Sequence, residues 1–255
     1  LGLAQADDQD TIRVAPTANM WLAAQKTSPF PTNADGQQGG QDGHINGRQI
    51  LGLSMDNDNI GIQSAVGVQQ HQIAGSTWTI PGNVDERLRF EGGKTRVHIR
   101  QVSVQARLPV VQIETGLMTS HWGLGMLAND GVHEPYFGLP EFGDRVIRAR
   151  ATTQPKDNGP WFIAGAIDRV IQDDMTIDPR RQWAQQAILS FLWRKDLESA
   201  GVYAVARSQN ELDTQRYTRV GVFDAYVDLT RPLGDNLSVN VAVEAATIAG
   251  KTNRL

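Results

Sequence analysis

The feature that most constrains the fold of this chain is a long-range alternation of apolar and polar residues. In the stretch VQIETGLM (residues 111–118), every second residue is apolar or β-branched. A helix would bring apolar residues back every three to four positions, whereas a period of two puts successive side chains on opposite faces of a β-strand. The pattern therefore predicts an all-β chain whose strands each have one apolar face and one polar face.

Alternating segments recur along the whole chain. They are Thr11–Gln25, Gln49–Asp56, Ile60–Ile73, Thr95–Leu108, Val110–Gly123, Arg145–Thr153, Trp161–Val170, Trp183–Arg194, Val202–Ser208, Arg216–Thr230 and Leu237–Ala249. Short corners such as NDN (57–59) alternate with long connections such as the Gly-rich NADGQQGGQDGHING (33–47). Outer-membrane barrels have this rhythm, because their short turns are periplasmic and their long loops lie outside. We therefore predict an antiparallel, up-and-down transmembrane β-barrel with about 11–12 strands in this chain and a periplasmic N-terminus.

A soluble β-sandwich also produces alternation, with its apolar side turned inward. Several segments here are longer than ten residues, whereas strands of soluble sheets average about 5–6 residues and a tilted membrane strand needs roughly 9–11. Trp183 and Trp193 share a face and, at ~3.3 Å per residue and a tilt near ~45°, lie ~24 Å apart along the membrane normal, about the height of an apolar band between aromatic girdles. We predict that Trp161, Trp183 and Trp193 belong to these girdles.

The parity of each segment assigns its side chains to lipid or to the lumen. The residues predicted to face lipid are Leu51, Leu53, Ile60, Ile62, Val66, Val111, Ile113, Leu189, Phe191, Val239, Val241 and Val243. The residues predicted to line the pore are Arg13, Arg107, Glu114, Arg148, Arg150, Asp168, Arg194, Asp224, Asp228 and Glu244. Because the charges on the lumen face balance, we expect no strong ion selectivity, and Arg148 with Arg150 would contact an anionic solute. The alternative is that these charges pair across strands in a packed or plugged interior.

Three places depart from the simple pattern. Residues 182–201 have a composition that favours a helix, and their place in the rhythm of the loops is what predicts a strand. His98 and Arg100 share parity with apolar residues, so either a bulge shifts the phase or that end of the strand lies above the membrane. Trp122 has the parity of the lumen, in a segment expected to continue as strand through Gly123.

Composition excludes several classes of function. The net charge of −4 and the pI of about 5.7 offer no basic excess for binding nucleic acid, and the absence of cysteine excludes disulfides and thiolate metal sites. Ser120 and His121 are adjacent, so in a strand they would point to opposite faces and could not form a catalytic pair. The DNDN stretch (56–59) fits an Asx turn better than a metal-binding loop. We expect no enzymatic activity, no cofactor and no bound metal.

The predicted number of strands is odd, whereas single-chain bacterial barrels normally have an even number. The sequence ends in AGKTNRL, without a closing aromatic residue. We expect residues 1–255 to form a single transmembrane β-barrel domain that is incomplete at its C-terminus and belongs to a larger barrel, because an open edge in lipid leaves backbone groups unsatisfied. A signal peptide, if there was one, is expected to have been removed before Leu1.

One patch of the sequence resembles a known family. It reads HWGLG (121–125) and continues to LANDG (127–131). It resembles a patch in uncharacterised, porin-like outer-membrane β-barrel proteins of deltaproteobacteria, especially myxobacteria, in which a strand that ends in a Trp-Gly-Leu-Gly patch leads into an external loop. The resemblance implies an outer-membrane location and a barrel fold, and it carries over no substrate and no catalytic residues. This chain departs from the family in being short.

These features predict a porin-like channel of the bacterial outer membrane that passes or hosts small polar solutes through a mixed-charge lumen. One alternative is a non-conducting barrel that serves as anchor or component of an envelope complex for secretion, adhesion or motility, with periplasmic or outer-membrane protein partners. Another is a soluble carbohydrate-binding β-sandwich. For the barrel, the expected partners are outer-membrane lipids, lipopolysaccharide and small polar solutes, and nucleic acid is not expected.

Overall fold

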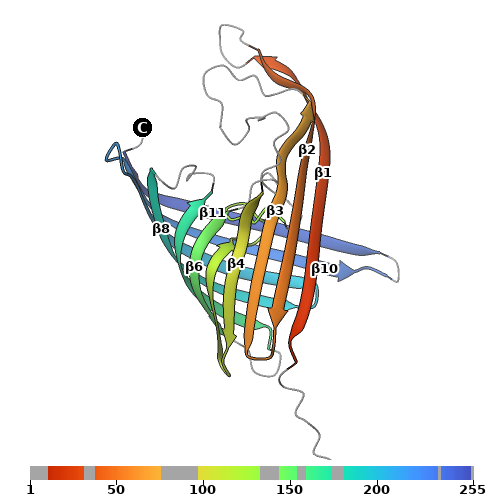
Figure 1. Ribbon diagram of the computed structural model, residues 1–255, viewed down its shortest axis with the longest axis vertical. Coiled ribbons are helices and arrows are strands. Elements are labelled where there is room, and N and C mark those ends of the chain that lie inside the picture. Colours follow the sequence, from red (N-terminus) through yellow and green to blue (C-terminus); the bar gives the residue numbers. More distant parts are fainter. Residues whose placement is uncertain are drawn as a thin grey trace, which may run out of the picture. The chain divides into compact units, whose positions relative to one another are not determined.

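The protein is built from β-strands that run antiparallel to their neighbours in one sheet. The computed structural model describes residues 11–31, 38–75, 97–132, 144–153, 159–173, 181–234 and 237–253. Within these ranges there are eleven strands in one sheet, ordered β1 to β11 as in the sequence (Figure 1). No helix in the described ranges is long and apolar enough to cross a membrane. The all-β, up-and-down architecture predicted from the alternation is therefore confirmed.

The strands have clear bounds. They are β1 (Arg13–Pro31), β2 (Gln38–Asp56), β3 (Ile60–Gly75), β4 (His98–Arg107), β5 (Val111–Thr119), β6 (Arg145–Thr153), β7 (Trp161–Gln172), β8 (Gln182–Lys195), β9 (Glu198–Glu211), β10 (Tyr217–Pro232) and β11 (Ser238–Thr252). Each strand from β5 to β10 pairs antiparallel with the next strand along the chain. The order has β1 at one end and β11 at the other, which is consistent with the expectation of a portion of a larger barrel.

The segment whose composition favours a helix is a strand. Strand β8 pairs with β7 from Ala184 to Trp193 and with β9 along its whole length. Helix propensity is a weak preference, and hydrogen bonding to a strand on each side overrides it. The turn that follows is tight, at residues 196–197, and Asp196 adopts a left-handed backbone with φ of 52°. Asp tolerates this conformation better than most residues, so the sequence suits the turn.

The prediction of a long Gly-rich loop after the first segment is wrong for residues 38–47. These residues are the first half of β2, and β1 extends to Pro31. Residues 32–37, the rest of that predicted loop, lie outside the described part of the chain. Gly is disfavoured in strands, but this preference is weak and depends on context, and hydrogen bonding to the neighbouring strands overrides it here. The Gly-rich composition therefore predicted a loop for residues that form part of a hydrogen-bonded strand.

The predicted end of one strand needs correction, and the exposure pattern of another bears on an alternative left open by the sequence. Strand β5 ends at Thr119, so Ser120, His121 and Trp122 lie beyond the strand and the rule of alternating faces does not apply to them. In β4, Ile99 and Val102 are both exposed although they are three residues apart. Arg100 is buried although it shares sequence parity with the exposed Val102, and this shift of phase is the one expected of the predicted bulge; the other alternative, that this end of the strand lies above the membrane, stays a prediction.

The chain forms two compact units. One unit contains residues 1–14, 54–64 and 101–255 and so includes β5 to β11 entire. The other contains residues 15–53 and 65–100, within which the buried Arg48 guanidinium donates to Asn19 Oδ1 at 2.9 Å. The functional site described below lies wholly in the first unit.

The two faces of the sheet differ sharply in the larger unit. Ile167 is 71% exposed, and its neighbour in β7, Asp168, is 1% exposed. In β10, Phe223 is 51% exposed, while Asp224 is fully buried. We call these the outward face, which carries Ile167 and Phe223, and the inward face, which carries the two carboxylates. A sheet of a soluble protein shows the opposite arrangement, with apolar side chains buried and charges in water.

Most residues predicted to face lipid are exposed, whichever unit they belong to. The exposed ones are Leu51, Leu53, Ile60, Ile62, Ile113, Leu189, Phe191, Val239, Val241 and Val243, and the half-buried ones are Val66 and Val111. The buried apolar side chains lie instead in two small clusters around Val146 and Val205, on the inward face. The described residues of the larger unit thus have their core on the same face as their buried charges.

Candidate functional site

Charged residues of neighbouring strands lie directly opposite each other on the inward face. Glu114 in β5 pairs in register with Arg150 in β6, and Arg148 pairs in register with Asp168 in β7. Both pairs form ion pairs. Opposite charges at directly facing positions stabilise a sheet, so the alternation of sign from strand to strand holds the inward face together.

The Arg148–Asp168 pair is the most buried of these contacts. The Arg148 guanidinium donates from Nε and from Nη2 to the two carboxylate oxygens of Asp168, both at 2.7 Å. Nη2 also donates to Ser120 Oγ at 3.0 Å, and the Gln186 amide donates to Asp168 Oδ2 at 2.8 Å. A bidentate, fully hydrogen-bonded pair of this kind fixes both side chains. Arg148 is therefore bound to a carboxylate inside the protein. Arg148 and Arg150 were predicted to contact an anionic solute, and in the structure the guanidinium group of each forms an ion pair with a carboxylate of a neighbouring strand.

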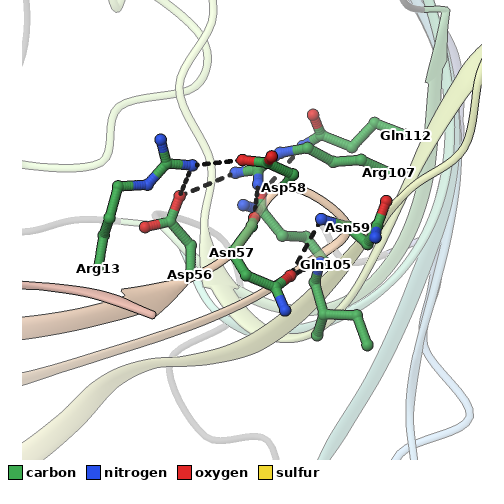
Figure 2. A network of polar contacts seen from close by, with 9 residues as sticks. Arg13, Asp56, Asn57, Asp58, Asn59, Gln105, Arg107 and Gln112 are labelled. Carbon is green, nitrogen blue, oxygen red and sulfur yellow. Dashed lines mark hydrogen bonds and ion pairs between the residues drawn. The ribbon is translucent and has the colours of Figure 1, made fainter. Parts of the chain in front are cut away.

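A second group of charges lies at the end of the strands where the connections are short (Figure 2). Asp56 accepts contacts from Arg13 and from Arg107, each at 3.5 Å, and Arg13 also reaches Asp58 at 3.3 Å. The Arg107 guanidinium donates to the carbonyl oxygen of Asn57 at 2.7 Å. Of the predicted pore-lining residues, Arg13 and Arg107 thus lie together at the edge of the sheet, bound to the β2–β3 turn.

The β2–β3 turn itself forms as predicted. The Asn57 side-chain oxygen accepts hydrogen bonds from the backbone N–H groups of Asn59 at 3.0 Å and Ile60 at 2.7 Å. This is the arrangement of an Asx turn, in which an Asn side chain replaces a backbone acceptor. The oxygen-rich DNDN stretch is thereby used for a turn.

The connection after β5 folds back as a compact segment. We call residues 120–132 the Trp122 segment. The backbone N–H of Trp122 donates to the carbonyl of Ala128 at 3.1 Å, and that of Gly125 donates to the carbonyl of Trp122 at 3.0 Å. Asp144, just before β6, donates its N–H to the carbonyl of Asn129 at 2.7 Å. These backbone hydrogen bonds give the segment a defined structure and attach it to the residue that precedes β6.

Trp122 attaches this segment to the inward face of the sheet. Its ring stacks on Tyr203 of β9, with centroids 4.9 Å apart and planes at 20°, and meets Tyr226 of β10 edge-on, with centroids 5.2 Å apart and planes at 89°. Both geometries are favourable for aromatic pairs. Gly201 leaves the space for the ring, because a Cβ at that position would lie 2.7 Å from Trp122 Cη2. The tryptophan therefore occupies a seat that one glycine and two tyrosines provide.

The next two residues bind the far strand of the sheet. The backbone N–H of Leu124 donates to Glu244 Oε2 at 2.6 Å. Gly123 has a φ of 57°, and a Cβ there would lie 2.9–3.0 Å from the Glu244 carboxylate. Gly123 is therefore required both by its left-handed backbone and by the close approach. Among the predicted pore-lining residues, Glu244 thus holds the Trp122 segment, and the fully buried Asp224 lies beside it as the cross-strand neighbour of Tyr203.

Two cavities adjoin at Ser120 and Tyr203. The one toward the short turns has a volume of about 460 Å³ and is lined by polar and charged groups, among them Arg150, Arg194 and Asp228. The one toward the long connections has a volume of about 320 Å³ and is lined mainly by apolar groups such as Val146, Val170 and Val222. The inward face therefore offers a charged chamber and an apolar chamber.

The remaining predicted residues of the pore border the charged chamber. Arg194 is exposed on the inward face, in register with Ser199 of β9 and through it with Asp228 of β10. Asp228 accepts a hydrogen bond from the Asn240 amide at 2.6 Å. Arg194 is the lining guanidinium of this chamber for which the described residues provide no carboxylate partner.

The predicted girdle tryptophans lie on the outward face. Trp161 pairs in register with Trp193, with ring centroids 6.4 Å apart, and stacks on Phe191 at 5.0 Å. Trp183 lies at the other end of β8, where the Arg169 guanidinium sits 3.6 Å from its ring centroid. Aromatic side chains thus occupy both ends of the outward face of β7 and β8, and apolar residues such as Ile163, Ile167 and Leu189 lie between them.

Sequence reasoning missed the residues that seat Trp122. Tyr203 and Tyr226 are aromatic residues at inward positions of β9 and β10, and their contact with Trp122 had no signal in the sequence because Trp122 lies beyond the end of β5. The role of Gly201 had no signal in the sequence. Ser120 Oγ accepts a hydrogen bond from Arg148, and His121 Nδ1 lies 3.9 Å from Asp130 Oδ1.

Comparison with protein-family models and with curated proteins finds no match to this chain. The site is therefore interpreted from its own geometry.

Proposed function

We propose that the protein is a β-barrel of the bacterial outer membrane whose inward face lines a lumen and whose Trp122 segment narrows that lumen to a passage for small polar solutes. The observation that carries the proposal is the reversal of burial along single strands, as in Ile167 and Asp168. Extended apolar surface is unfavourable in water and is the preferred contact of hydrocarbon. An outward apolar face with charges inside is the pattern of a barrel in a membrane.

The connections support a direction for the chain in the membrane. The turns at 57–59, 108–110 and 196–197 are short, and the connection that holds the Trp122 segment, 120–144, is long. In outer-membrane barrels short turns are periplasmic and long loops are external. We therefore place β1 as rising from the periplasm, and the Trp122 segment as an external loop folded into the lumen.

The mixed charge of the inward face sets the expected selectivity. Arg148 and Arg150 are each neutralised by a carboxylate on the neighbouring strand. The charged chamber then has one guanidinium, Arg194, against one carboxylate, Asp228. A passage with balanced charge discriminates little between small cations and anions, so the solutes proposed are small and polar rather than of one sign.

A non-conducting barrel is the second candidate, and the Trp122 segment is the observation that favours it. The segment is fixed by two aromatic contacts and by the bond from Leu124 to Glu244. If the remaining space is too narrow for solutes, the barrel would serve as an anchor or component of an envelope complex. The third candidate, a soluble sandwich, needs a second sheet over the outward face, and the described residues form one sheet.

Conductance in planar bilayers tests the proposal. The purified protein should give stepwise currents, and a KCl gradient should give a reversal potential near zero. Trp122→Ala should raise the unit conductance because it removes the ring from the inward face. Trp183→Ala is the matched control, since this ring lies on the outward face and its loss should leave the conductance unchanged.

The candidates differ in outcome. Currents that grow in the Trp122→Ala variant support a passage narrowed by this segment. A barrel that inserts but stays silent in both variants would establish the non-conducting alternative. A chain that remains dispersed in buffer without detergent would favour the sandwich.

A further inference from the structure

The outward face carries a line of polar and basic residues near the long connections. One residue from each of five adjacent strands stands in register: Arg169 in β7, Gln185 in β8, Ser208 in β9, Arg219 in β10 and Lys251 in β11. The residues two positions toward the short turns on these strands are Ile167, Ala187, Ala206, Gly221 and Ala249. The line therefore marks the boundary at which the apolar part of the outward face ends.

Arg219 and Lys251 are two cations placed directly opposite each other. They are Cα partners in the β10–β11 ladder and are both exposed. Side chains at such positions have Cβ atoms about 4.5–5.5 Å apart, and like charges there repel. The described residues form no ion pair with either side chain. This arrangement is unfavourable unless an anion lies between the two cations.

Carboxylates are scarce on this part of the outward face. The acidic residue among the outward positions of β7 to β11 is Glu198, which lies at the short-turn end and is bound to Arg231 at 2.6 Å. Asp213, in the β9–β10 connection, is bound to Arg181 at 2.9 Å. Glu198 thus lies at the opposite end of the face from the basic line and Asp213 is already paired, so the described outward positions of β7 to β11 supply no carboxylate to Arg219 or Lys251.

Aromatic residues lie next to the basic line on its outer side. Trp183 and Tyr217 stand in register through Asn210 of β9. Arg169 lies over the Trp183 ring, and Arg219 lies 5.7 Å from the centroid of the Tyr217 ring. Tyr and Trp mark the level of lipid headgroups in membrane proteins. The basic line is therefore at the level where lipid phosphates would lie.

A groove runs from this line into the apolar part of the face. It has a volume of about 520 Å³ and is open, with Arg219, Gln185 and Ser208 at one side. Its floor is Ala187, Ala206, Gly221 and Ala249, which are in-register partners from β8 to β11. The large side chains Leu189 and Phe223 lie two residues further along β8 and β10. Small side chains between large ones leave room for an apolar chain to lie against the backbone.

We propose that this groove binds an anionic, phosphate-bearing lipid of the bilayer, with the phosphate at the edge of the groove between Arg219 and Lys251 and one acyl chain over Ala187, Ala206 and Gly221. The inference rests on the proposed membrane location. The bound phosphate separates the two cations, and the acyl chain covers the small residues that would otherwise leave a void in the lipid packing.

Quenching of tryptophan fluorescence by brominated lipids tests the inference. The protein is reconstituted in phosphatidylcholine vesicles that contain brominated phosphatidylglycerol or, in a parallel series, brominated phosphatidylcholine. The wild-type protein should prefer phosphatidylglycerol by about fivefold for each cation. Arg219→Gln with Lys251→Gln should remove the preference, and Lys195→Gln, at the short-turn end of the outward face, should keep it.

A second variant separates the groove from simple attraction of charge. Gly221→Leu fills the floor and keeps both cations, and a Cβ at Gly221 meets its nearest neighbour at 3.9 Å, so the variant should fold. We expect it to lose the preference for phosphatidylglycerol. A Gly221→Leu variant that keeps the full preference would overturn the groove, and so would loss of the preference on adding inorganic phosphate.

Insertion is measured separately by protection from protease in the same vesicles. A protein that inserts but shows no preference between the two lipids would overturn this inference and leave the proposed membrane location intact. A protein that does not insert would overturn both.

Discussion

The two faces of β7 to β11 differ in what they expose and what they bury. Apolar side chains are exposed on the outward face and charged side chains are buried on the inward face, the reverse of a sheet in a soluble protein. On the outward face Ile167 and Phe223 are exposed, and on the inward face their neighbours Asp168 and Asp224 are buried. The outward face has no described layer over it, whereas the inward face is held by ion pairs and covered in part by the Trp122 segment. The difference teaches that polar contacts order the inward face of this sheet, and that the exposed apolar side chains of the outward face would be stable in the apolar surroundings of the proposed membrane.

Removing one partner of the buried ion pair should have the largest effect on stability. Asp168→Ala leaves the Arg148 guanidinium buried without its carboxylate, and loss of one partner of a buried pair typically costs about 3–5 kcal/mol. Urea titration of the refolded protein in detergent or lipid measures the free energy of unfolding. The double variant Arg148→Met with Asp168→Ala should recover part of the loss. A single variant as stable as the wild-type protein would mean that the inward face is not held by this pair.

A charge on the outward face should be the next most costly change. Val241→Arg puts a guanidinium among exposed apolar residues in the middle of β11, and arginine at the bilayer midplane costs about 2–4 kcal/mol. Asn240→Arg, one residue earlier on the inward face, should cost much less. Reversible unfolding in lipid gives both values. Equal costs would mean that the faces are assigned in reverse or that the outward face does not meet hydrocarbon.

A side chain at Gly201, against which the Trp122 ring packs, should have a smaller effect on stability and should displace the ring. Gly201→Ala places a Cβ 2.7 Å from the ring, and overpacking of this kind costs about 1–3 kcal/mol. The ring should move from Tyr203, which a shift in tryptophan fluorescence would report. Gly165→Ala on the outward face of β7, where a Cβ meets its nearest neighbour at 4.0 Å, is the control and should be near neutral. An unchanged tryptophan signal in Gly201→Ala would show that the ring is not held there.

The exposed ion pairs at the short-turn end should contribute least. Arg13 is 62% exposed and contacts Asp56 and Asp58 at 3.3–3.5 Å (Figure 2). Surface pairs of this kind are worth about 0–1 kcal/mol because water and salt screen them. Arg13→Ala should therefore lower the free energy of unfolding by less than Asp168→Ala does. Added salt should make the effect of Arg13→Ala smaller still, because it screens the exposed pair. A cost as large as that of the buried pair would contradict the distinction between the two networks.

The sequence predicted the features that depend on period two. The exposed Val239, Val241 and Val243 and the strand β8 follow from parity and from the rhythm of the connections, because a strand in a ladder repeats the same environment every second residue. The sequence left open whether Glu114 and Arg150 line a pore or pair with opposite charges. Parity placed both residues on one face, but it did not fix the register that puts them opposite each other.

The sequence did not predict the features that depend on long-range contacts. Trp122 lies beyond β5, and its seat is built by Gly201 and two tyrosines far along the chain. No local pattern encodes such a meeting. Residues 38–47 were predicted as loop because Gly and Gln dominate them, and pairing with a neighbouring strand decided otherwise.

Accessibility of spin labels along β8 tests the central claim most directly. The chain has no cysteine, so single cysteines can be introduced and labelled one at a time. In lipid vesicles, labels at Ala187, Leu189 and Phe191 should collide with dissolved oxygen and be protected from a water-soluble nickel chelate. Labels at Gln186 and Ser190 should show the reverse. Outward labels that are reached by the nickel chelate as readily as inward ones, or that are shielded from both reagents by protein, would contradict the account.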